Sequence, residues 1–244
     1  MNSLSSHQLL RIWEYGRNQH PVDQALTLLS LILPDQNRSE LAELSIGQRD
    51  NYLLVLREKL FGETLYCAGA CPDCMQAVDI LLTTKDIKID TNEIEQGETE
   101  LAWKDIHIAY RSPNSTDLAA IVNTHNDQQA RLTLIQRCLL KIDRQGVAIA
   151  AEELPEQAIL KTEQAIIQHD PQAEILLDMS CPECGAQWQL LFDIVDFLWT
   201  EIAVKAKRLL QEVHTLAKTY GWTEGRILQL SDARRQIYLE MISV

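Results

Sequence analysis

The sequence predicts a mainly helical α+β protein that contains a small antiparallel zinc-ribbon β element joining two distant turns. Three observations lead to this fold class. Two C-P-x-C segments, Cys71–Cys74 and Cys181–Cys184, lie far apart in the chain. Short apolar stretches flank each segment, a pattern typical of a strand, a tight turn and a second strand. Most other apolar residues recur with helical spacing.

Residues 1–62 are expected to form an N-terminal helical segment. Its helices are predicted over 4–16, 21–33 and 46–60. Pro21 suits the first turn of the second helix, because its missing N–H is not needed there. Ser45 is the expected N-cap of the third helix, and Gly62 follows its end.

The two C-P-x-C segments predict a zinc ribbon made of hairpins over 63–84 and 173–194. Two residues between the cysteines let a tight turn aim both sulfurs at one point, and proline fixes φ early in that turn. The predicted metal ligands are Cys71, Cys74, Cys181 and Cys184. Four thiolates complete the tetrahedral set of a structural Zn2+ and leave no position for water or substrate. A structural role is therefore expected for the metal.

The remaining cysteines and the redox state of the paired ones leave alternatives to this zinc site. Cys67 lies four residues before Cys71 and is an alternative ligand, although the C-x-x-C pairs have the better spacing. Cys138 lies in an apolar run and is expected to be a buried small residue. A redox motif would need only one pair, and two disulfides would indicate a secreted protein. The N-terminal residues show no signal-peptide pattern, so a cytoplasmic location and a bound metal are expected.

Residues 85–172 are predicted to form an inserted segment of strands and helices. The acidic residues 85–100 are expected to form a loop, and the alternating residues 100–111 one or two strands. Helices are predicted from a cap at Ser115 or Thr116 to about 124, over about 127–142 and over 155–169. In the middle helix, the expected core-facing residues are Leu132, Leu134, Ile135, Cys138 and Leu139.

Residues 195–244 predict a C-terminal helical segment. We expect a long helix over 195–219, a short helix capped by Thr223 and a final helix over 232–243 capped by Ser231. The expected buried stripe of the long helix is Phe197, Leu198, Ile202, Leu209, Leu210, Val213 and Leu216. Its carboxylates Glu201 and Glu212 are expected to be surface charges.

The C-terminal segment is also the predicted partner-binding region. Trp, Tyr and Arg are common interface anchors, and they are dense here. The predicted partner-binding residues are Trp199, His214, Tyr220, Trp222, Arg234, Arg235 and Tyr238.

Composition favours a protein-binding module over an enzyme or a nucleic-acid reader. The net charge of −13 argues against phosphate contacts and favours protein partners. The sequence contains no phosphate-binding loop, dinucleotide fingerprint, H-E-x-x-H motif or G-x-S-x-G motif, so no catalytic residue and no small-molecule substrate are predicted. Apolar runs are too short for a membrane span. Two alternatives stay open: a zinc-ribbon regulator contacting nucleic acid or the transcription machinery, and an enzyme with a site around His214 and Glu212.

Several motifs in the last third of the chain resemble a known family. The most informative is H-x-L-A-x-x-Y-G-W, from His214 to Trp222. The others are Asp170–Glu174, Cys181–Gly185, Phe192–Ile194, Phe197–Ile202, Ile227–Ser231 and Arg234–Leu239, together with Leu44–Asp50 and Phe61–Gly62. These motifs resemble small proteins encoded with contractile injection systems and phage-like tails, related to T-even phage baseplate proteins and baseplate hub assembly chaperones. The resemblance implies a non-enzymatic, cytoplasmic protein that builds or assembles a baseplate, with baseplate or hub proteins as its partners.

Overall fold

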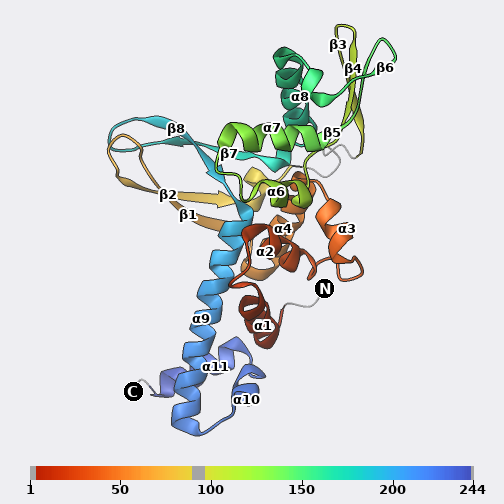
Figure 1. Cartoon of the computed structure of the whole chain (residues 1–244). Helices are drawn as coiled ribbons and strands as arrows, with labels where there is room; N and C mark the ends of the chain where they lie inside the picture. Colours follow the sequence, from red (N-terminus) through yellow and green to blue (C-terminus); the bar gives the residue numbers. More distant parts are fainter. Residues whose placement is uncertain (1–3, 90–96, 243–244) are drawn as a thin grey trace. The chain divides into compact units, whose positions relative to one another are not determined.

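The computed structural model describes residues 4–89 and 97–242 and confirms the mainly helical α+β fold class (Figure 1). Contacts divide the chain into two compact units. The first unit joins the residues up to Leu28 with those from Ile194 onward, and the second covers Leu29–Asp193. Residues 90–96 of the expected acidic loop and the predicted helix end at 243 lie outside the described residues, whereas residues 85–87 of that expected loop are helical.

The first unit is built on one long helix, α9 (Ile194–Tyr220). Three helices pack against it: α1 (Ser6–Gly16), α10 (Glu224–Leu228) and α11 (Asp232–Ile242). The sequence prediction of these helices is confirmed, including the N-caps: Thr223 accepts from the Arg226 amide and Ser231 from the Arg234 amide. Buried apolar residues of α1, α9 and α10, most of them leucines, form the core of this unit.

The buried stripe of α9 differs in part from the predicted one. Leu210 is exposed and Phe197 is half-buried, whereas Ala206 and Glu212 are buried instead. Leu210 follows the buried Leu209 directly, and because a step of one residue turns a helix by about 100°, Leu210 points away from the core that Leu209 faces. Helix α2 (Pro21–Leu29) ends earlier than predicted, because residues 30–36 form turns.

The helices of the second unit are α3 (Arg38–Glu43), α4 (Ile46–Phe61), α5 (Thr84–Ile87), α6 (Ser115–Ile121), α7 (Asp127–Cys138) and α8 (Glu156–His169). Ser45 caps α4 as predicted, and Gly62 ends it at φ 91°. The α6 cap was predicted wrongly: Asn114, one residue earlier, accepts from the amides of Thr116 and Asp117 at 3.0 and 3.1 Å. An Asn at this position competes well with Ser as a cap.

A four-stranded antiparallel sheet, in the order β3-β4-β5-β6, gives the second unit one of its cores. Its strands are β3 (Thr99–Trp103), β4 (Ile106–Tyr110), β5 (Leu139–Arg144) and β6 (Val147–Ala148). The prediction that α7 continues to 142 is wrong, because Leu139 pairs with Tyr110 and starts β5. Of the predicted core face of α7, Ile135 and Cys138 are buried but Leu132 is exposed.

Two further two-stranded sheets are the predicted hairpins. The first is β1 (Thr64–Ala70) with β2 (Ala77–Thr83), and the second is β7 (Ile175–Ser180) with β8 (Gln187–Phe192). Figure 1 shows the hairpins side by side with their turns at the same end. They approach closely, since a Cβ added at Gly69 of β1 would lie 3.5 Å from Leu190 of β8. Within residues 4–89 and 97–242, no helix combines the length and apolar character needed to cross a membrane.

Candidate metal centre

The two hairpin turns have the same backbone geometry. In the first, the Cys71 amide donates to the Gln76 carbonyl at 2.9 Å and the Met75 amide donates to the Cys71 carbonyl at 2.9 Å. The second turn repeats both bonds at the equivalent positions, at 2.8 and 3.0 Å. In each turn the residue after the second cysteine has a positive φ, 61° at Met75 and 74° at Gly185. The C-P-x-C sequence thus folds into one local structure at two distant places.

The turns bring four cysteine sulfurs together. The Sγ atoms of Cys71, Cys74, Cys181 and Cys184 all lie within 4.8 Å of one another. Cys71 Sγ lies 3.6 Å from Cys184 Sγ, and Cys74 Sγ lies 3.6 Å from Cys181 Sγ. A disulfide needs about 2.05 Å, whereas metal–sulfur bonds of about 2.3 Å in a tetrahedron separate the sulfurs by about 3.8 Å. The geometry therefore fits one tetrahedral metal ion and no disulfide.

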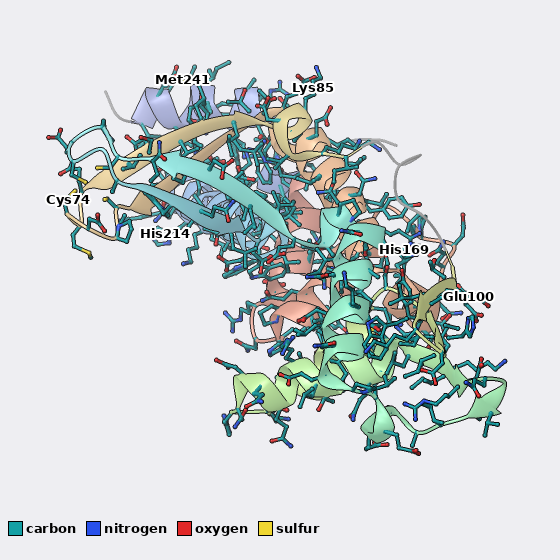
Figure 2. All side chains as sticks on the ribbon, turned by 90° about the horizontal axis from the view of Figure 1, so that it is seen from above. Cys74, Lys85, Glu100, His169, His214 and Met241 are labelled. Carbon is teal, nitrogen blue, oxygen red and sulfur yellow. The ribbon has the colours of Figure 1, made fainter. Side chains whose placement is uncertain are left out.

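Each close sulfur pair joins the two hairpins rather than two cysteines of one turn. In Figure 2, Cys74 and the neighbouring sulfurs lie at the tip of the paired hairpins. The first cysteine of each turn is buried, Cys71 fully and Cys181 at 2% exposure, while Cys74 and Cys184 are exposed. A metal ion held here would link segments that are more than a hundred residues apart in the sequence.

The electrostatics of the cluster call for a cation. Backbone N–H groups, chiefly that of Cys184, lower the pKa of Cys181 to about 7. A backbone hydrogen bond from Ala186 favours the Cys184 thiolate, but burial and the neighbouring sulfurs outweigh it and raise the pKa of Cys184 to about 12. One thiolate therefore suppresses the next, and four can coexist only around a positive ion. An all-thiolate tetrahedral set suits Zn2+.

The other two cysteines lie outside this cluster. Cys67 is half-buried on β1 opposite Ile80 and is not part of the four-sulfur group. Cys138 at the end of α7 is 1% exposed, which confirms its prediction as a buried small residue. Burial also raises the pKa of the Cys138 thiol to about 12, so it stays protonated at neutral pH.

Two of the predicted partner-binding residues hold the first unit together. Arg235 is 1% exposed, and its guanidinium donates to Glu212 at 2.9 Å, to the Leu230 carbonyl at 2.7 Å and to Ser6 at 3.2 Å. This network ties α1, α9 and α11 to one another. Trp199 is half-buried against α1, where a Cβ added at Gly16 would lie 2.2 Å from the indole ring.

The other predicted residues gather partly into one aromatic cluster. The rings of Tyr220 and Trp222 stack with centroids 4.8 Å apart, and Tyr238 meets Trp222 edge-on at 4.9 Å. The exposed Arg226, which the sequence analysis did not single out, lies 5.6 Å above the Trp222 ring. We call these four residues, together with the exposed Arg234, the aromatic patch. The sequence could have indicated this contact, because Arg226 follows Trp222 by four residues at a helix start and arginine commonly packs over a Trp ring.

A comparison with protein-family models matches residues 8–199 to the family described as T4 bacteriophage base plate protein. The match spans both hairpins and all four clustered cysteines. The chain belongs to this family. No curated protein and no solved structure matches the chain. Membership indicates a structural role related to a baseplate, which agrees with the baseplate part of the resemblance; the motifs from His214 onward lie outside the matched residues.

The enzyme alternative around Glu212 and His214 has no geometric basis in this baseplate-family protein. Glu212, predicted as a surface charge, is buried and accepts hydrogen bonds from Arg208, Arg235 and Gln236. His214 is exposed. Residues two apart on a helix point to different sides, so the two side chains do not form an acid–base pair. Sequence reasoning missed the burial of Glu212 because its main partner lies on another helix.

Proposed function

We propose that the chain is a non-enzymatic component or assembly chaperone of the baseplate of a contractile injection system, and that it acts by binding baseplate or hub proteins. The observation that carries this proposal is the family match over residues 8–199. The net charge of −13 supports it, because an acidic protein suits protein partners better than phosphate backbones. On this proposal the protein works in the cytoplasm before or during its incorporation into a tail-like particle.

We also propose that a structural zinc ion is bound by Cys71, Cys74, Cys181 and Cys184. The sulfur spacing and the all-sulfur donor set support zinc, and a closed set leaves no position for substrate. The ion would close a loop of more than a hundred residues, and the entropy cost of closure grows only slowly with loop length. Metal binding should therefore be coupled to folding of the second unit.

The aromatic patch is the proposed partner surface. Its rings combine large apolar area with the exposed cations Arg226 and Arg234, and aromatic residues with arginine dominate binding energy at protein interfaces. Tyr220 of the patch is exposed, and so is the predicted partner residue His214. Arg235 and Trp199 contribute by holding the helices that present the patch rather than by touching the partner.

The test is an affinity pull-down of the tagged full chain from its native host, followed by mass spectrometry. Wild type is compared with a variant carrying Arg226→Glu and Arg234→Glu, and with Lys161→Glu on α8 as a matched charge reversal in the other unit. We expect wild type and Lys161→Glu to capture baseplate or hub proteins and the double variant to lose them. Equal capture by all three would exclude the aromatic patch as the partner surface.

The identity of the captured proteins also distinguishes an assembly chaperone from a permanent subunit. Baseplate, spike or hub proteins without tube and sheath indicate an assembly chaperone, and complete particles indicate a permanent subunit. Capture of RNA polymerase or DNA with no baseplate protein would replace this proposal by the zinc-ribbon regulator.

A further inference from the structure

The outer faces of the two hairpins carry the same exposed apolar pair. On the first, Tyr66 lies opposite Leu81, and these side chains are 78% and 67% exposed. On the second, Leu176 lies opposite Leu191, at 45% and 61%. In both hairpins the pair sits five residues before the first cysteine and seven after the second. Large apolar side chains repeated at equivalent exposed positions indicate a contact surface rather than isolated exposure.

All charged side chains of both hairpins are also acidic. Residues 64–83 and 174–193 contain no Lys, Arg or His. They contain six carboxylates, all exposed: Asp73, Asp79, Glu174, Asp178, Glu183 and Asp193. A dication held by four thiolates leaves the metal site itself negative, so it adds to this field. Elsewhere in the chain cations are interspersed with acids, as at Lys205 and Asp232, which form an ion pair at 2.8 Å.

The second hairpin adds a hollow beside its apolar pair. A cavity of about 390 Å³ is lined by Asp178, Met179, Ser180, Gln187, Trp188 and Gln189. The Gln189 amide donates to the Asp178 carboxylate at 3.1 Å, which holds that charge at the rim. Leu176, Leu191 and the fixed Asp178 carboxylate thus lie on one face of β7 and β8, and the neighbouring hollow is lined by residues of both faces of the hairpin.

We propose that the outer face of β7–β8, and its counterpart on β1–β2, docks a basic segment of another baseplate protein. Apolar side chains of that segment would cover Leu176 and Leu191, while its Lys and Arg side chains face Asp178 and its neighbours. Charge selects the occupant, because a second copy of this face and a nucleic acid would both be repelled. Two equivalent faces give the ribbon two docking positions. This inference rests on the proposed baseplate role and adds a second surface to it.

The first experiment places a photo-crosslinking amino acid at Leu191 in the full chain expressed in its host. A matched control carries the same group at Leu160 of α8, which is 41% exposed. We expect the Leu191 position to crosslink to a lysine- or arginine-rich segment of a baseplate protein and the Leu160 position not to. Crosslinks to a second copy of the chain or to nucleic acid, or none at all, would overturn the proposal.

The second experiment measures affinity for the crosslinked protein after its purification. Asp178→Lys and Leu191→Ser should each weaken binding about tenfold, and added salt should weaken the wild-type complex, whereas Glu152→Lys should change nothing. Zinc content equal to wild type shows that the variant ribbon is folded. Unchanged affinity in both variants would overturn the docking face.

The outcomes separate this inference from the proposed function. Baseplate capture by the wild-type chain without a crosslink at Leu191 would exclude the docking face but not the baseplate role. A crosslink to a basic protein unrelated to baseplates would support the docking face and exclude the baseplate role.

Discussion

The two cysteine-bearing hairpins have the same turn geometry but differ in what they bury. Their turns have the same hydrogen bonds, and in each the first cysteine is buried and the second exposed. Their inward-facing residues differ in size. At the four inward-facing positions nearest the turn, the first hairpin has the smaller residues Cys67, Gly69, Val78 and Ile80, and the second has the larger Leu177, Met179, Trp188 and Leu190.

This difference indicates which part of each hairpin is positioned by packing and which part by the proposed metal. A large face against a small face fills the space between two hairpins, while two large faces would hold the sulfurs apart. Gly69 marks the closest approach, because Leu190 lies at van der Waals distance from where its Cβ would be. On the proposed metal site, shared sulfur ligands would position the ends of the hairpins, while complementary size positions their bodies. The predictions below test each contribution.

The largest effect should come from breaking the shared ligand set. Cys71→Ser in the first turn and Cys184→Ser in the second should lose the metal equally, because on the proposed site each would contribute one of four ligands to one ion. Structural zinc sites contribute folding free energy on the order of 10 kcal/mol in small domains, so both variants should lose the cooperative unfolding of the second unit. Metal content by atomic spectroscopy and thermal unfolding measure both consequences.

Cys67→Ser is the matched control. Cys67 lies on β1, the strand that leads into the first turn, but outside the sulfur cluster. The variant should therefore keep one metal per chain and the wild-type unfolding temperature. Metal loss in Cys67→Ser as large as in the other two would show that the ligand set is different.

An intermediate effect should come from the packed faces. Gly69→Leu places a large side chain against Leu190 and should cost about 1–3 kcal/mol of unfolding free energy. Leu190→Ala should cost about 2 kcal/mol, because it leaves the small face without its partner. In the double variant the new leucine occupies the vacated space, so its cost should be smaller than the sum. Additive costs, measured by denaturant unfolding of the metal-bound protein, would refute size complementarity.

Features set by a few adjacent residues could be predicted from the sequence. The C-P-x-C spacing determines each turn, and Ser45 with Gln48 determines the start of α4. Helix α3 was missed although Asn37 and Glu40 form a capping box at its start, because its six residues are too short to show a helical period. The region after α7 was assigned to a helix because a short apolar run does not distinguish helix from strand.

Features set by distant residues could not be predicted. The sequence shows Arg235 as a charged residue on a helix, and its burial depends on partners that include Glu212, 23 positions away, and Ser6 of α1. The division of the chain into two units likewise depends on the N-terminal helix packing on the last ones. The equivalence of the outer hairpin faces was visible in the sequence, but their exposure follows only from the way the hairpins pair.

The smallest effect should come from the one position where the turns differ in backbone strain. Met75 occupies a left-handed conformation that costs a residue with a Cβ about 1 kcal/mol, whereas Gly185 adopts its equivalent freely. Nothing lies within 4 Å of a Cβ added at Gly185, so Gly185→Ala should lose about 1 kcal/mol through its backbone alone. Met75→Gly should gain somewhat less, because glycine also adds freedom to the unfolded chain and the exposed Met75 side chain packs on little. Chelator competition at fixed zinc resolves such differences, since 1.4 kcal/mol changes the apparent affinity tenfold. Opposite signs for the two variants would show that the turns carry the same strain at the same position, and equal signs would show that the two turns are not equivalent.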